Sequence, residues 1–211
     1  RVGECMSMKI IGLCGSSGSG KGYASCVFEA LGIPSIDTDR LYREKTARGN
    51  SPCLKELASE FGALILDGAG ELNRGALAKI VFEDDKTGVK LKRLNEITHK
   101  YIKIDTEELI ECYKQRGACA VVVDAPVLYE SGFDKMCDFC VCVISPLEEK
   151  LRRITERDKI TKEKALARLN AQMSDSELIK RAKYKIDNSG ADIEAQIIEI
   201  LKKENIHIKE Q

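Results

Sequence analysis

The sequence predicts an α/β fold in which helices cover both faces of a parallel β-sheet, giving three layers. Apolar runs that resemble strands alternate with amphipathic helical patterns, and this alternation is typical of parallel sheets. One run, residues 118–123, is uniformly apolar and ends at Asp124, as in a strand that is buried on both faces. A glycine-rich loop joins the first predicted strand to the first predicted helix. These three features place the chain in the α/β class.

The composition is that of a globular protein with one sizeable core. Of the 211 residues, 43% are hydrophobic and 32% are charged. The 34 basic residues equal the 34 acidic ones, so no net field draws the chain to nucleic acid or to an anionic membrane. The longest apolar stretch, 118–123, is too short to cross a bilayer, and no secretory segment precedes Met8. We therefore expect a cytoplasmic protein that binds neither nucleic acid nor membrane. Nothing in the sequence indicates an oligomeric state.

The nine cysteines are interpreted as free thiols, because an odd number in a chain without an export signal favours a reducing compartment. Cys137, Cys140 and Cys142 form a close group, for which metal binding is the alternative. The strand-like alternation of residues 139–144 and the lack of a second ligand pair at zinc-like spacing favour buried thiols. No metal-ligating residue is therefore assigned.

The first predicted strand, 8–14, leads into the segment Gly15-Ser-Ser-Gly-Ser-Gly20-Lys21. The spacing G-x-x-x-x-G-K lets small residues wrap a loop whose backbone N–H groups converge on a polyphosphate, while the lysine adds a positive charge at the outer phosphates. The next segment has apolar residues at helical spacing, namely Ala24, Val27, Phe28 and Leu31. A helix should therefore begin at Lys21, with its positive dipole end toward the anion. The order of strand, loop and helix predicts a phosphate loop (P-loop) of the NTPase type.

One position departs from the usual phosphate loop. The residue after the lysine is normally a serine or threonine whose hydroxyl binds magnesium, and here it is Gly22. Ser25 lies about 4.5 Å further along the helix axis, at about 1.5 Å per residue, and is a poor substitute. The sequence therefore puts direct magnesium ligation by the loop in doubt.

Acidic residues follow the next short strand, predicted around residues 35–36. Asp37 and Asp39 come at its end, and the carboxyl ends of strands are where α/β sheets carry their chemistry. Ser51 and Pro52 then predict the N-cap and first turn of a helix.

The rest of the chain continues as helices and strands. The pattern is mostly helical to about Gly117, with an apolar face at Leu91, Leu94 and Ile97. After the strand at 118–124, the predicted elements are a strand at 140–144, a helix from Pro146, a helix at 161–173, a helix that begins at the capping box Ser174-x-x-Glu177, a strand at 185–187 and a terminal helix with Ile193, Ile197 and Leu201 on one stripe.

A series of short motifs runs through residues 8–201. They are Gly12-Leu-x-Gly15 with the phosphate loop, Ile36-Asp-x-Asp39, Phe61-Gly62, Gly70-Glu-Leu-Asn-Arg74, Val81-Phe82, Leu94-Asn95 before His99, Ala125-Pro-x-Leu-x-Glu130, Arg153 with Arg157-Asp158, Ala171-Gln172 and Asn188-x-Gly190. In this order the motifs resemble the dephospho-coenzyme A kinase family, which completes coenzyme A by phosphorylating a ribose 3'-hydroxyl.

The resemblance implies one kinase domain at residues 8–211, preceded by an extension at 1–7. The domain would contain a helical subdomain for the acceptor at 60–116 and a lid at 146–173 that carries arginines. It also implies ATP and magnesium as cofactors and dephospho-coenzyme A as the substrate.

Site residues are carried over on the same basis. Lys21, Asp39 and Arg153 would be catalytic, with Asp39 taking or orienting the proton of the acceptor hydroxyl. The expected nucleotide-binding residues are Gly15, Ser17, Gly18, Ser19, Gly20, Lys21, Gly22, Tyr23, Arg157 and Asn188. The expected substrate-binding residues are Asp37, Arg74, His99, Tyr129 and Glu130.

Each of these roles has a structural alternative. The aspartates could cap the following helix, the arginines could form surface ion pairs, and Asn188 could simply form a turn. Phosphoryl transfer needs no covalent nucleophile, so Cys14 and Cys26 are interpreted as packing residues. His99 could instead be an ordinary position on a helix surface.

Three other functions remain to be weighed. Another nucleoside or nucleotide kinase would share the loop, and Gly22 leaves open a weakly active nucleotide-binding homologue. A regulatory guanine-nucleotide switch is disfavoured, because no Asn-Lys-x-Asp motif occurs in the chain. Further departures from the family pattern are Ser16-Ser17, Lys100 and Lys183, and none of them removes a predicted catalytic residue.

Overall fold

The computed structural model describes residues 7–47, 49–83 and 87–208, so the predicted extension at 1–7 lies outside them except for Ser7. The chain divides into two compact units. The first comprises residues 1–37 and 109–211, and the second comprises residues 38–108. None of the helices in the described ranges combines the length and apolar character that a membrane span requires.

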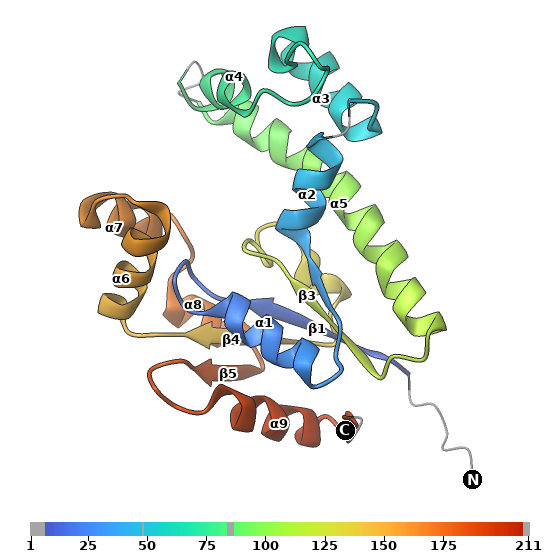
Figure 1. Ribbon diagram of the computed structural model, residues 1–211, viewed down its shortest axis with the longest axis vertical. Helices are drawn as coiled ribbons and strands as arrows, with labels where there is room; N and C mark the ends of the chain where they lie inside the picture. The colour runs from blue at the N-terminus through green and yellow to red at the C-terminus, as the bar shows by residue number, and fades with distance from the viewer. Residues whose placement is uncertain (1–6, 48, 84–86, 209–211) are drawn as a thin grey trace. The chain divides into compact units, whose positions relative to one another are not determined.

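The first unit is built on a parallel sheet whose strands are all paired in parallel. In order across the described sheet, the strands are β2 (Ser35–Asp37), β3 (Ala120–Asp124), β1 (Lys9–Cys14), β4 (Phe139–Ile144) and β5 (Tyr184–Asp187) (Figure 1). The predicted α/β class with a parallel sheet is confirmed. Because β1 is central, the loop that follows it leaves from the middle of the sheet.

Helices cover both faces of this sheet. The helical elements in the described part of this unit are α1 (Lys21–Ala30), the last residues of α5 (Val89–Gln115), the 3-10 turn η3 (Phe133–Met136), α6 (Leu147–Asp158), α7 (Lys162–Asn170), α8 (Asp175–Arg181) and α9 (Ile193–Lys203). On one face α1 and α9 (Figure 1) pack against each other and bury a shared core with the strands, while α8 contacts β4 and η3 contacts β1. The predicted apolar stripes form this core, with Phe28 and Ile197 fully buried.

The second unit is helical in its described part. It contains α2 (Thr38–Ala47), α3 (Pro52–Phe61), the 3-10 turn η1 (Ala63–Ile65), α4 (Arg74–Ala78), the π-helical turn η2 (Lys79–Glu83) and most of α5. The predicted N-cap is confirmed, since the Ser51 hydroxyl accepts the N–H of Leu54 at 3.1 Å. Ile97 is buried in the core of this unit, and Leu91 and Leu94 pack against it.

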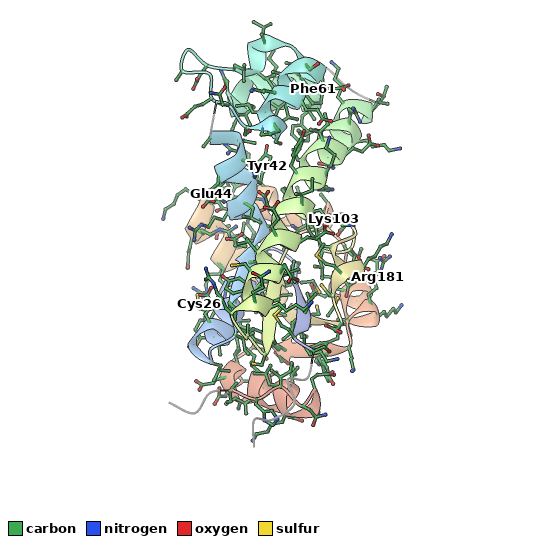
Figure 2. All side chains as sticks on the ribbon, turned by 90° about the vertical axis from the view of Figure 1, so that its right-hand side faces the viewer. Cys26, Tyr42, Glu44, Phe61, Lys103 and Arg181 are labelled. Carbon is green, nitrogen blue, oxygen red and sulfur yellow. The ribbon has the colours of Figure 1, made fainter. Side chains whose placement is uncertain are left out.

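The structure corrects four local predictions. Helix α2 begins at Thr38, so Asp39 lies in the first turn of a helix and not at the end of a strand. The helix that follows Thr161 ends at Asn170, short of the predicted 173. Strand β4 shows no alternation, because it is an interior strand of a sheet that helices cover on both faces. Cys26 is exposed on α1 (Figure 2), since it lies outside the stripe that faces the sheet.

Candidate active site

The phosphate loop connects β1 to α1, and the helix begins at Lys21 as predicted. The loop closes on itself through a bond from the N–H of Ser19 to the carbonyl of Ser16, at 3.1 Å. Gly20 is the N-cap of α1 with a left-handed φ of 97°, and a Cβ there would lie 1.9 Å from Nδ2 of Asn188. A side chain at this position would therefore be strained by the backbone and would also clash.

The Ser19 hydroxyl is fully buried beside this loop and has no hydrogen-bond partner among the described residues. A buried polar atom of this kind normally has a partner, and a phosphate oxygen would supply one. The loop thus combines backbone N–H groups at a helix start, an unsatisfied hydroxyl and the ammonium of Lys21, which together suit a polyphosphate.

The Lys21 ammonium forms an ion pair with the carboxylate of Asp124, at the carboxyl end of β3. Asp124 is only 7% exposed. Its register partner on the neighbouring strand is Asp37, the last residue of β2. The carboxyl edge of the sheet therefore presents two carboxylates on adjacent strands, next to the lysine of the phosphate loop.

Our sequence reasoning missed Asp124. The signal was available, because Asp124 ends a uniformly apolar run and the carboxyl ends of parallel strands are where α/β proteins bind ligands. Its pairing with Lys21 joins positions 103 residues apart, which no local pattern reveals.

The two carboxylates suit a magnesium ion better than the hydroxyls nearby. Magnesium is commonly held by about one or two carboxylates together with substrate phosphates and water. Asp37 and Asp124 provide such a pair, whereas the Ser25 hydroxyl is engaged with that of Ser35 at 2.7 Å. No group of three or more histidine, cysteine or acidic side chains in the described ranges has a metal-binding arrangement.

Arg153 is held against the phosphate loop by hydrogen bonds. Its Nη1 donates to the carbonyls of Gly18 at 3.1 Å and Ser19 at 3.4 Å, and to the Ser145 hydroxyl at 3.2 Å. Asn188 donates from Nδ2 to the same Ser19 carbonyl at 2.9 Å. Both side chains therefore support the second half of the loop.

Arg157 and Tyr23 are not among these loop contacts. The Arg157 guanidinium forms a two-point ion pair with its neighbour Asp158, at 2.7 and 3.0 Å. Hydrogen bonding to this guanidinium lowers the pKa of Asp158 to about 2. The Arg157 side chain is exposed, and so is Tyr23. In this arrangement Arg157 has the surface ion pair that we gave as its structural alternative.

Tyr129 and Glu130 differ in their surroundings. The Tyr129 hydroxyl is buried near the thiols of Cys14 and Cys140, and burial raises its pKa. The Arg181 guanidinium lies 5.4 Å from the centre of the Tyr129 ring. Glu130 is exposed. The Tyr129 hydroxyl is thus directed into the protein.

In the second unit, Arg74 contacts its own neighbours, His99 is half-buried and Asp39 is exposed. Arg74 donates to the Thr46 hydroxyl at 2.9 Å, and its guanidinium lies 5.2 Å from the ring centre of Tyr42. His99 lies on α5, and burial lowers its pKa, which favours the neutral imidazole.

Comparison with known proteins identifies the family. A family model described as "Dephospho-CoA kinase" matches residues 9–194. The dephospho-CoA kinase of Listeria monocytogenes is 39% identical over 181 residues, which cover 86% of this chain and 88% of the relative. A crystal structure from Thermus thermophilus aligns with a TM-score of 0.78 at 30% identity, covering 94% of this chain and 98% of that one. The solved dephospho-CoA kinase of Campylobacter jejuni shares the fold, with a TM-score of 0.60 at 23% identity and coverage of 94% and 98%.

The family model spans most of the chain, and it includes the phosphate loop, both carboxylates at the sheet edge and the arginine that supports the loop. These matches and the site geometry lead to one conclusion: the chain belongs to the dephospho-CoA kinase family.

Proposed function

We propose that the protein transfers the γ-phosphoryl group of ATP to the ribose 3'-hydroxyl of dephospho-coenzyme A, the last step in the synthesis of coenzyme A. Membership of the kinase family supports this reaction. The single structural observation that carries it is the ion pair of Lys21 and Asp124, which holds an ammonium group beside a loop suited to a polyphosphate.

On the nucleotide side of the reaction, catalysis depends mainly on electrostatic stabilisation of the transferred phosphoryl group. Phosphoryl transfer proceeds through a loose transition state whose charge lies mainly on the transferred oxygens, so positioned cations lower the barrier. The loop amides bind the polyphosphate, and Lys21 stabilises the charge on the transferred group. Arg153 supports the loop carbonyls and adds positive charge nearby.

On the acceptor side, Asp39 takes or orients the proton of the attacking hydroxyl. Arg74, His99, Tyr129 and Glu130 contribute to binding the acceptor, with the neutral His99 acting as a hydrogen-bond donor and not as a charge. The acceptor subdomain comprises residues 60–116, and the lid comprises residues 146–173. Free thiols along the described chain are consistent with a cytosolic protein.

Magnesium, when bound with ATP, neutralises charge on the phosphates. Asp124 and Asp37 are the residues that would hold it, directly or through water, because they end neighbouring strands at the same edge of the sheet. This arrangement compensates for the hydroxyl that is missing at Gly22.

A substrate comparison tests the assignment. Purified protein is offered ATP and magnesium with dephospho-coenzyme A, AMP or uridine in parallel, and ADP release is measured. We expect dephospho-coenzyme A to be the preferred acceptor. Preferential phosphorylation of AMP or uridine would instead assign the chain to another class of small-molecule kinase.

Replacing Gly22 by serine should strengthen magnesium binding. A Cβ at Gly22 meets nothing within 4 Å, so the side chain fits without displacing a neighbour. We expect Gly22→Ser to lower the magnesium concentration for half-maximal activity by about threefold or more, because a hydroxyl ligand is added. Magnesium titration of the initial rate measures this change.

A matched control is Cys26→Ser, which adds a hydroxyl to the exposed surface of the same helix and should leave the titration unchanged. If the parent protein is inactive and Gly22→Ser is active, the chain is a degenerate homologue and the proposed activity is wrong. If the two titrations coincide, the missing hydroxyl has no bearing on magnesium.

A further inference from the structure

A buried lysine of α6 contacts the phosphate loop without belonging to it. Lys150 is only 7% exposed, and its ammonium donates to the Ser16 hydroxyl at 3.2 Å and to Oδ2 of Asp175 at 2.7 Å. The Ser16 hydroxyl donates in turn to Oδ1 of Asp175 at 2.9 Å. The three side chains therefore form a closed network that joins the loop to α6 and to the start of α8.

The neighbouring loop residues are held in the same way. The N–H of Ser17 donates to Oε1 of Gln172 at 2.9 Å, and Nε2 of Gln172 donates back to the Ser17 hydroxyl at 3.3 Å. Gly18 lies directly against the backbone of Lys150, because a Cβ on Gly18 would be 2.6 Å from the Lys150 carbonyl oxygen. Residues 16–18 are thus each anchored by α6 or by the 172–175 segment.

An ion pair whose lysine is buried and whose carboxylate is partly buried is a costly way to fill space. Removing charge from water carries a penalty, and well-packed apolar side chains of similar size are often as stabilising. What an ion pair adds is a defined orientation for its hydrogen-bond partners. Here the partner is the Ser16 hydroxyl, in the first half of the phosphate loop.

We propose that Lys150, paired with Asp175, is a positioning residue that holds residues 16–18 of the phosphate loop in the conformation that receives ATP. The proposal rests on nucleotide binding by this loop. A loop that is already ordered loses less conformational entropy when its ligand binds, so affinity rises. The effect should therefore fall on ATP binding and not on the transfer step.

The first test measures ATP affinity and kinetics of Lys150→Met. We expect the Kd and KM for ATP to rise about tenfold, while kcat and the KM for the acceptor stay within about twofold. Lys162→Met is the matched control, since the Lys162 ammonium pairs with Glu148 at 3.0 Å on the exposed surface, with side chains 61% and 77% exposed. We expect that variant to match the parent protein.

Asp175→Asn separates positioning from simple charge. If Lys150 only adds positive charge near the phosphates, removal of its counter-ion should tighten ATP binding. If the network positions the loop, ATP binding should weaken, because the bonds from Lys150 and Ser16 to the carboxylate are lost or weakened. Tighter ATP binding in Asp175→Asn would therefore overturn the proposal.

The double variant Lys150→Met/Asp175→Leu separates positioning from folding stability. Apolar replacement of both partners should restore the melting temperature toward that of the parent protein, while ATP affinity stays weak. Recovery of both quantities would show that the pair is merely structural. Ser16→Ala, which leaves the ion pair intact, should weaken ATP binding severalfold at an unchanged melting temperature.

These outcomes are distinguishable from failure of the proposed function. If the parent protein does not bind ATP, the phosphate-loop assignment itself is wrong. If the parent binds ATP and Lys150→Met binds it equally well, only the role of Lys150 is wrong. Calorimetric titration with ATP, together with thermal melting of each variant, supplies both readings.

Discussion

Lys21→Ala is expected to lower the rate of phosphoryl transfer by at least about 100-fold, because it removes a preorganised charge from the transferred group. Lys21 lies where the phosphate loop meets the start of α1, and its ammonium forms an ion pair with the carboxylate of Asp124. It therefore needs little reorganisation when charge develops on the phosphoryl oxygens. Steady-state kinetics with saturating ATP and acceptor would measure the loss in kcat.

Lys21→Ala also removes the counter-ion of the buried Asp124 carboxylate, so folding stability has to be measured alongside activity. Loss of one partner of a buried pair can cost about 3–5 kcal/mol. Lys21→Ala/Asp124→Asn removes both charges and should recover stability without recovering activity. Lys203→Ala, which removes an exposed lysine paired with Glu199, is the control and should behave like the parent. Activity of Lys21→Ala within a few fold of the parent would contradict the assigned role.

Asp39→Asn is expected to lower kcat by about 100-fold or more, as is typical when a general base is lost. The substitution keeps the size of the side chain and removes its ability to accept a proton. ATP affinity should change by less than about twofold, because Asp39 is assigned to the acceptor and not to the nucleotide. Single-turnover rates and a separate ATP titration would measure the two effects.

Asp192→Asn provides the matched control for this experiment. Asp192 is the N-cap of α9, and its carboxylate accepts the N–H of Ala195 at 3.1 Å. Asparagine caps helices about as well as aspartate, so this variant should keep both activity and stability. If ATP binding collapses in Asp39→Asn, the residue acts on the nucleotide side and the assigned role is wrong.

Local patterns predicted the parts of the fold that depend on local physics. The loop and the start of α1 were predicted because glycine spacing and helical periodicity lie within about 20 residues of one another. The caps at Ser51 and Ser174 were also predicted, since capping depends on side chains three positions apart. The parallel sheet followed from the alternation of apolar runs and helical segments.

These local patterns did not predict contacts between segments that are distant in the sequence. The pairing of Lys150 with Ser16 joins positions 134 residues apart, and nothing around residue 150 distinguishes it from other charged helix positions. Likewise, Cys26 sits one position from the apolar stripe of α1, and its exposure follows from how the helix meets the sheet. The acceptor-side roles of Asp39, Arg74 and His99 stay predictions.

Because β1 is central and β2 lies at the edge of the sheet, the backbone segments that carry the site differ in how readily they open. Strands that are paired along both sides open least readily, whereas short edge strands fray first. The phosphate loop follows β1, which is paired along both sides. Asp124 ends β3, which is also paired along both sides. Asp37, by contrast, closes a three-residue strand at the border of the sheet. The two acids that end these neighbouring strands thus differ in backbone rigidity, and Asp37 belongs to the strand that opens more readily.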